Sequence, residues 1–183
     1  MREMSASRDS RTDRELVDAV LRHQDELAFR ALYRLHTPRV FALVARLLAR
    51  GDHEAEEVVQ EIWIHAFESL GRFHWNSSFA TWLTGIALNR VRDRIRKYGR
   101  SRESTVEAPE TAGAPAMYEA RSDLERAIAR LGDSERMVLV LHDVEGMKHR
   151  EIAERLDIPE GTSKTHLFNA RKRVRAMMSG GES

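Results

Sequence analysis

Apolar residues recur every three or four positions along most of the chain, and this spacing limits the possible folds more than any other feature. The stretch around Leu43, Val44, Leu47 and Leu48 is a clear example. Residues at this spacing share one face of an α-helix, whereas a half-buried strand would alternate apolar and polar side chains. No stretch alternates in a sustained way, and only 4 prolines and 10 glycines interrupt the 183 residues. The sequence therefore predicts an all-α fold.

A change of composition divides the helical pattern into two parts. Residues 99–117 are dominated by Gly, Ser, Thr, Pro, Ala and Glu, and apolar periodicity is lost there, which predicts a flexible linker. Residues 13–98 and 118–178 are then expected to form two small helical domains. The polar residues 1–12 are expected to be disordered, and the tail 179–183 to be frayed.

Several helix boundaries follow from local signals. Pro38 suits the first turn of a new helix, and Asp52 is expected to cap the helix that follows it. A serine cap ends the loop 71–78, and a long helix is expected from Phe79 to about Lys97. In the second domain, breaks near 131–134, 144–146 and 157–161 predict four helices. The helix after Asp52 is expected to bury the apolar side chains Val58, Val59, Ile62, Trp63 and Phe67.

Composition excludes several classes of protein. The chain has no cysteine, so it has neither a disulfide framework nor a thiolate metal site. Its polar N-terminus is unlike a signal peptide, and no apolar run approaches the roughly 20 residues of a membrane span. We expect a cytoplasmic protein that does not insert into a membrane. No metal-ligand or catalytic motif is present, so we expect no cofactor, metal or catalytic residue.

Charge is unevenly distributed although the net charge is only +1. Residues 52–61 hold five acids and no Lys or Arg, whereas Lys and Arg dominate residues 90–102, and residues 164–175 hold five bases and no acid. One acidic block and two basic blocks indicate two kinds of partner.

The C-terminal basic block lies in a pattern of helix, tight turn and helix. Ile152, Ala153 and Leu156 form an apolar stripe, residues 157–161 supply the turn, and Thr162 is expected to cap the second helix. A helix-turn-helix places its second helix in the major groove, where amides and small polar groups contact bases and Lys or Arg contact phosphates. The alternative is a packed helical hairpin with a solvated cationic face.

A second nucleic-acid signal lies in residues 72–100. Four aromatic residues, Phe73, Trp75, Phe79 and Trp82, precede a run of bases, and such a combination suits melted or single-stranded nucleic acid. For Phe79 and Trp82 the alternative is a place in the core of an amphipathic helix. Asn89 is an amide that is able to contact a base edge.

Together the motifs resemble a bacterial RNA polymerase sigma factor of the extracytoplasmic-function (ECF) group. Residues 55–73 (AEEVVQEIWIHAFESLGRF) are similar to the family's core-binding helix, and residues 77–97 (SSFATWLTGIALNRVRDRIRK) to its promoter-melting helix. Residues 124–176 are similar to its C-terminal DNA-binding domain. The order is that of the family, and the match covers nearly the whole chain.

The resemblance implies a function in promoter-specific initiation and assigns residues to three surfaces. Residues 13–98 would be a region 2-like domain that binds core RNA polymerase, on a coiled coil of its largest subunit, and the −10 element as melted strand. Residues 118–178 would be a region 4-like domain that binds the −35 element as duplex, near the polymerase flap region. An anti-sigma factor is a further candidate partner.

The implied polymerase-binding residues are Asp52, Glu56, Glu57, Val59, Gln60, Glu61 and Trp63. The implied −10 residues are Phe73, Trp75, Asn76, Ser78, Phe79, Trp82, Asn89, Arg92, Arg96 and Lys97. The implied −35 residues are Arg150, Thr162, Ser163, Lys164, Thr165, His166, Asn169, Arg171 and Arg173.

The chain departs from the family pattern at a few positions. Asp157 occupies a turn position often held by Gly, and Asp adopts the left-handed conformation less readily. Ser163 stands where an apolar residue is usual, which predicts looser packing of the recognition helix.

The alternative function is a helix-turn-helix regulator that acts without docking on core polymerase. An enzyme is a third possibility, although the chain has no HExxH or ExxH pair.

Overall fold

The computed structural model describes residues 12–103 and 122–179, and every regular element in these ranges is helical. The first domain comprises α1 (Asp13–His23), α2 (Glu26–Leu48), α3 (Asp52–Ser69), the short η1 (Leu70–Arg72) and α4 (Phe79–Glu103). The second comprises α5 (Asp123–Ala129), α6 (Asp133–Leu139), the π-helical turn η3 (Val140–Val144), α7 (His149–Leu156) and α8 (Glu160–Ser179). The all-α prediction is confirmed.

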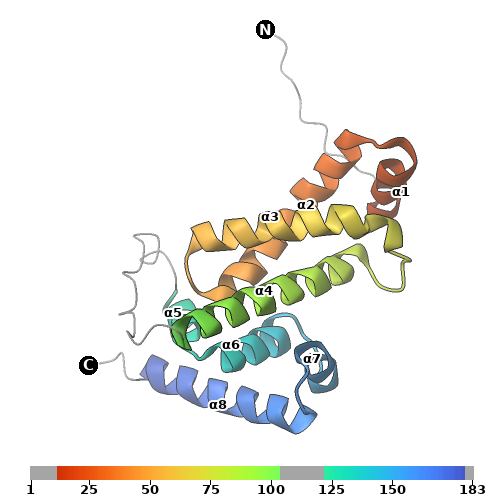
Figure 1. The fold of residues 1–183 in the computed structure, drawn as a ribbon. Coiled ribbons are helices and arrows are strands. Elements are labelled where there is room, and N and C mark those ends of the chain that lie inside the picture. Colours follow the sequence, from red (N-terminus) through yellow and green to blue (C-terminus); the bar gives the residue numbers. More distant parts are fainter. Residues whose placement is uncertain (1–11, 104–121, 180–183) are drawn as a thin grey trace.

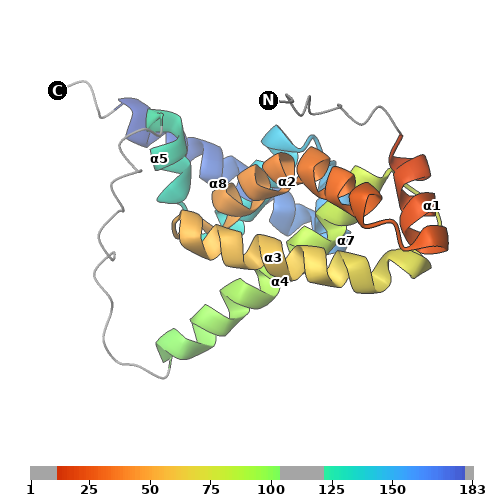
Figure 2. The ribbon, with the colours of Figure 1, turned by 90° about the horizontal axis from the view of Figure 1, so that it is seen from above.

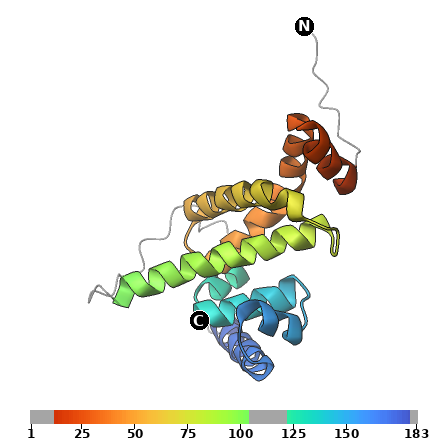
Figure 3. The ribbon, with the colours of Figure 1, turned by 45° about the vertical axis from the view of Figure 1, so that its right-hand side comes forward.

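The molecule is layered around α4. In Figures 1 and 3, α4 runs between α3 on one side and the helices of the second domain on the other. Seen from above, α2 and α3 lie along each other, and α4 extends past them (Figure 2). The buried apolar side chains of α2, α3 and α4 and those of α6, α7 and α8 form one connected core cluster. The two domains therefore pack against each other in this structure.

Pro38 lies inside α2, which corrects the prediction that a new helix begins there. Proline removes one backbone hydrogen bond, to the carbonyl four residues earlier, and normally kinks a helix. Here α2 continues because both halves bury apolar side chains, such as Ala28 and Leu32 before the proline and Val44 and Leu47 after it.

Two predicted caps are also wrong. Gly51, with φ 103°, is the N-cap residue of α3, and Asp52 is the first helical residue. Thr162 lies inside α8, which begins at Glu160 directly after Pro159. The amide of Ser163 donates to the carbonyl of Pro159 at 3.1 Å, so the helix starts three residues earlier than expected. The serine cap is Ser78, whose hydroxyl accepts from the amide of Thr81 at 3.1 Å.

The predicted linker begins too early. Residues 99–103 continue α4 as helix, and residues 104–117 lie outside the described residues, as do residues 1–11 and 180–183. Within the described ranges, no helix is both long and apolar enough to cross a membrane.

Candidate polymerase and promoter interfaces

The acidic face of α3 lies on the outside of the first domain and is organised by one arginine. Arg94, on α4, is mostly buried and lies 3.7 Å from Glu54, 3.2 Å from Glu57 and 2.7 Å from Glu61. Although burial alone would lower it, hydrogen bonds and charge interactions with Glu57 and Glu61 raise the pKa of Arg94. Glu57 and Glu61 remain about half exposed, so each also presents carboxylate surface to a partner.

Burial separates the predicted polymerase-binding residues into two groups. Glu56, Glu57, Gln60 and Glu61 are exposed, and Asp52 is partly exposed at the start of α3. Val59 and Trp63 are only 3% and 4% exposed, which conflicts with direct contact to a partner. Their side chains lie in the core beneath the acidic face.

Two exposed apolar side chains on α3 were not among the predicted contacts. Ile64 is 61% exposed and Phe67 is 57% exposed, and the expectation that Phe67 would be buried is wrong. Both are on the helix face that carries Gln60. The ring of Phe67 contacts Phe29 edge-on, with centroids 5.2 Å apart. Periodicity alone did not distinguish Phe67 from core residues, because apolar side chains occupy a wide sector of α3.

The four aromatic residues before the basic helix form one cluster around Phe73. Its ring stacks on Trp82 at 4.9 Å and contacts Trp75 at 4.6 Å and Phe79 at 5.9 Å. Phe79 is 1% exposed and Phe73 is 8% exposed, which places both in the core and conflicts with base stacking on them. Trp75 is partly exposed, and the guanidinium of Arg14 lies 4.5 Å from its ring centroid.

Trp75 has the left-handed backbone conformation, with φ 58°. A bulky residue adopts this conformation only when the surrounding structure holds it there, and such strain is common at functional sites. The loop presents Asn76 and Ser78 beside Trp75, and both are exposed. Trp75 and Trp82 are the two aromatics of the cluster that are partly exposed. Trp75 lies in the polar loop, so it is the better candidate for contact with an unstacked base.

The polar residues predicted for the −10 element share a surface on α4. Asn89, Arg92 and Arg96 line a polar cavity of about 320 Å³ together with His65, Arg90 and Asp93. Lys97 is exposed one residue beyond Arg96. The cavity combines an amide with several guanidinium groups, a combination that suits a base edge and its phosphates.

The second domain contains the predicted helix-turn-helix, formed by α7 and α8. Asp157 has φ 56°, so it adopts the left-handed conformation, and the amide of Ile158 donates to the carbonyl of Ala153 at 3.1 Å. Leu167 and Ala170 bury one face of α8 against the domain core. The outward face carries Thr165, Phe168 and Lys172, all exposed.

Phe168 was not predicted as a site residue, although it is 66% exposed in the middle of this outward face. An exposed aromatic ring on a recognition helix is suited to contact with a thymine methyl group. Lys164 and Arg150 are also exposed, and Thr162, His166 and Asn169 are partly exposed along one flank.

Ser163 is fully buried, which conflicts with its predicted contact to DNA. Its hydroxyl pairs with Nδ1 of His149 at 3.0 Å. The pair ties α8 to α7 and replaces the usual apolar contact by a hydrogen bond. The looser packing that was expected at Ser163 is therefore not observed.

Several of the Lys and Arg side chains predicted to contact phosphate form ion pairs with acidic side chains in this structure. Arg171 makes two hydrogen bonds to the carboxylate of Asp143, at 2.6 and 3.0 Å. Lys164 pairs with Glu160 at 2.7 Å, and Arg173 pairs with Glu135 at 3.0 Å. Although burial opposes it, hydrogen bonds from Arg171 and His142 lower the pKa of Asp143. Arg171 would have to leave this pair, or share it, to contact a phosphate.

Stability of the second domain should depend on the protonation of His149. Burial, followed by the charges of His142, Lys164 and Arg171, lowers the pKa of His149 from 6.5, against the opposing effect of Glu160. The unfolded chain therefore binds a proton more readily, so stability is present above about pH 6.5 and is lost as the pH falls. We expect the Tm to fall between pH 7.5 and 5.5, and to fall less in His149→Gln. An equal fall in both proteins would contradict this role, and His53→Gln, at an exposed histidine, is the matched control.

The two helical domains and the candidate surfaces on them define this chain as a protein of the sigma-70 type. The family model for Sigma-70 region 2 matches residues 32–101, and that for Sigma-70 region 4 matches residues 121–174. The chain is 31% identical over 179 residues to the ECF RNA polymerase sigma-E factor of Escherichia coli (strain K12), covering 89% of this chain and 92% of that protein. It is also 31% identical to the ECF RNA polymerase sigma factor SigW of Bacillus subtilis (strain 168), covering 84% and 90%. The chain therefore belongs to the ECF RNA polymerase sigma factors.

Solved structures have the same fold. CnrH in complex with the cytosolic domain of CnrY matches with a TM-score of 0.60 and 26% identity, over 93% of this chain and 99% of that chain. The sigma factor RpoE in complex with the anti-sigma factor NepR from Bartonella quintana matches with a TM-score of 0.61 and 22% identity, over 82% and 96%. The second likeness concerns the fold alone.

Proposed function

We propose that this sigma factor binds core RNA polymerase through the outer face of α3 and directs it to promoters through α4 and α8. One observation carries the proposal. A single chain holds an exposed acidic helix, a basic helix with an aromatic loop, and a helix-turn-helix, in the order of the family. Polymerisation chemistry belongs to the partner enzyme. The three surfaces supply docking, strand capture and duplex recognition.

The docking surface consists of the exposed carboxylates of α3 and the apolar side chains beside them. Glu57 and Glu61 are held in fixed directions by Arg94, which reduces the entropy lost when a basic partner binds them. Ile64 and Phe67 supply the apolar contact area that the buried Val59 and Trp63 do not. A charged surface with an apolar centre suits association with a basic helical partner.

The −10 element is proposed to contact the loop around Trp75 and the polar cavity of α4. Extruding a base from a duplex costs a few kcal/mol, which contacts in a pocket must offset. Trp75 offers a ring surface, and Asn89 offers an amide beside the guanidinium groups of Arg92 and Arg96. Arg14 would have to move off the ring of Trp75 for a base to stack there.

The −35 element is proposed to contact the outward face of α8 as duplex. Thr165 and Asn169 are placed for base edges, Phe168 for a thymine methyl group, and Lys164 and Lys172 for phosphates. The two solved structures described above are complexes with a second protein, and we extend to this chain the expectation of an anti-sigma partner.

Replacing Asn89 by alanine should impair strand opening more than duplex capture. The amide lies in the polar cavity of α4 and, at a surface position, contributes little to packing. We expect permanganate reactivity of melted thymines to fall by about tenfold, equivalent to about 1.4 kcal/mol for one base contact. Retention of the closed polymerase–promoter complex is the internal control. Unchanged melting would remove Asn89 from the site.

Gel filtration with purified core polymerase tests the proposal against its main alternative. The sigma-factor function requires co-elution of the chain with core. A helix-turn-helix regulator would bind promoter duplex by itself, typically as a dimer, and would elute apart from core. The second pattern would contradict the proposed function.

A further inference from the structure

An arginine of α1 covers part of the loop that we propose holds an unstacked base. The guanidinium carbon of Arg14 lies 4.5 Å from the ring centroid of Trp75. A cation is attracted to the face of an aromatic ring within roughly 6 Å of its centroid. Figure 1 shows α1 beside the turn that follows α3, where this loop begins. The cation therefore occupies the ring that the −10 proposal offers to a base.

The first turn of α1 is anchored to the core of the domain. Asp13 pairs with Nε2 of His36, on α2, at 2.9 Å. The side chain of His36 is only 11% exposed, and its ring centroid lies 5.0 Å from that of Phe79 at the start of α4. A capping box also defines the N-terminus of α1. Because α2 and α4 hold this helix start in place, the backbone of Arg14 stays beside Trp75.

The charge of Arg14 is not neutralised by a carboxylate among the residues that the structure describes. Asp18 lies four residues further along α1, at the usual spacing for an ion pair within a helix. In the described part of the chain, however, no ion pair joins the two, and the guanidinium lies against Trp75 instead. Lys164 and Arg171 of the −35 surface, by contrast, each pair with an acid. Arg14 thus keeps its charge available to an anionic partner.

A base that stacks on Trp75 has to displace this guanidinium. The phosphate of the same nucleotide then lies close to the displaced group, because a single sugar joins base and phosphate. Arginine has a long side chain and a planar fork of N–H donors that matches phosphate oxygens. Arg14 is exposed, so its side chain is able to move from ring to phosphate without disturbing the core.

We propose that Arg14 is a further DNA contact of the −10 site, which covers Trp75 in the free protein and binds a phosphate of the melted strand once a base replaces it on the ring. The inference rests on the proposed function of the loop, and it extends the −10 surface from α4 onto α1. Leaving the ring loses one exposed cation–π contact, and a charge-assisted hydrogen bond to phosphate exceeds this loss.

Acrylamide quenching of tryptophan fluorescence tests the covered ring in the free chain. Arg14→Gln removes the cation and keeps part of the side chain, so it should raise the quenching constant. In a Trp75→Phe background the same substitution should change nothing, because the tryptophan that Arg14 covers is gone. Equal quenching constants for wild type and Arg14→Gln would overturn the covered state.

Binding of single-stranded DNA by the complex with core polymerase tests the phosphate contact. The probe is a pool of fluorescein-labelled strands of random sequence, about 15 nucleotides long. Random sequence suffices because phosphate contacts carry no sequence information. Anisotropy is measured over a range of salt concentrations, with core polymerase alone as the blank. Arg14→Gln should weaken binding by about fivefold and lower the slope of log affinity against log salt by about 0.7, the value for one phosphate of a single strand.

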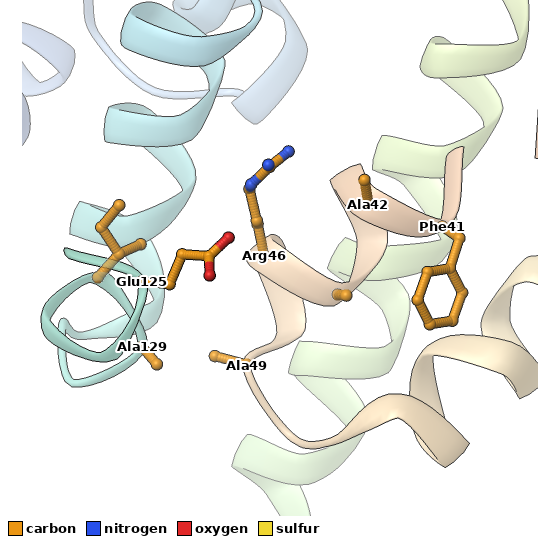
Figure 4. Close-up of a pocket in the computed structure, with 8 residues that line it drawn as sticks. Phe41, Ala42, Arg46, Ala49, Glu125 and Ala129 are labelled. Atoms are coloured by element: carbon orange, nitrogen blue, oxygen red, sulfur yellow. The ribbon is translucent and has the colours of Figure 1, made fainter. Parts of the chain in front are cut away.

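Two substitutions make this result specific. Arg14→Lys retains the charge and should keep the wild-type slope. Arg46→Gln removes a charge about ten residues beyond His36, which is about 15 Å further along α2. In Figure 4, Arg46 extends from α2 beside a cavity of about 180 Å³ that Ala49 and Ala129 also line, so its loss should leave the slope unchanged. An unchanged slope in Arg14→Gln, or an equal fall in Arg46→Gln, would overturn the phosphate contact.

Trp75→Gly separates this inference from the proposed function. Glycine adopts the left-handed conformation of this position without strain, so the variant removes the ring and keeps the turn. Weaker binding in Trp75→Gly together with wild-type binding in Arg14→Gln would refute the role of Arg14 and leave the base contact standing. Wild-type binding in Trp75→Gly together with a lowered slope in Arg14→Gln would refute base stacking and leave the phosphate contact of Arg14 standing.

Discussion

Phe79→Ala should lower the free energy of unfolding of the first domain by about 3–5 kcal/mol, the usual cost of removing a buried aromatic ring. Phe79 is 1% exposed. Its ring contacts those of His36, Phe73, Trp63 and Trp82, with centroids between 5.0 and 6.5 Å away. Among the residues that the structure describes, no other side chain of this domain joins the loop before α4 to both α2 and α3 through ring contacts.

Urea unfolding followed by tryptophan fluorescence reports on the first domain, because all three tryptophans lie there. Phe67→Ala is the matched control, since Phe67 is 57% exposed and its loss should cost no more than about 1 kcal/mol. If Phe79→Ala were as stable as the control but failed to open promoters, Phe79 would be a base contact and its assignment to the core would be wrong.

Reversing charge on the outer face of α3 should have the largest effect on polymerase binding. Glu56→Arg with Glu61→Arg places two cations where we propose that a basic partner docks. We expect affinity for core polymerase to fall by about 30-fold or more, which is about 2 kcal/mol. Surface plasmon resonance with immobilised core measures the change, and circular dichroism at the same temperature checks the fold.

Two further substitutions make this result specific. Glu26→Lys, at an exposed site on α2, reverses one charge outside the proposed docking surface, which is half the change in net charge of the double reversal, and it should leave the affinity within about twofold. Arg94→Gln removes the cation that orients Glu57 and Glu61 while leaving both carboxylates in place. We expect it to weaken binding less than the double reversal. A double reversal that binds core as tightly as Glu26→Lys would move the docking surface away from α3.

The sequence predicted the positions of the helices better than it predicted which side of each helix is buried. Apolar spacing of three to four residues placed α3 and α4 correctly, because the spacing records a shared buried face. The same spacing did not reveal that Phe67 points outward while Trp63 points inward. On a helix that is apolar over much of its surface, the neighbouring helices decide which side is covered.

Site residues could be predicted from the sequence where their role depends only on residue type and position on one helix. They could not be predicted where the role depends on a contact with another helix. Asn89 and Lys164 were identified from residue type and position on a helix. Ser163 was misassigned because its partner, His149, lies on another helix, and no local pattern indicates that pair. The buried Arg136 donates to the backbone carbonyls of Leu47 and Leu48 in α2, and it was not predicted for the same reason, since these acceptors are nearly ninety positions away in the sequence.

Promoter selection by the complete chain tests the central claim most directly. Core RNA polymerase should be incubated with genomic DNA of the source organism, with and without this protein, and the 5′ ends of the transcripts sequenced. We predict a set of start sites that appears only with the protein and that shares one motif near −35 and another near −10. Identical start sites with and without the protein would contradict the claim.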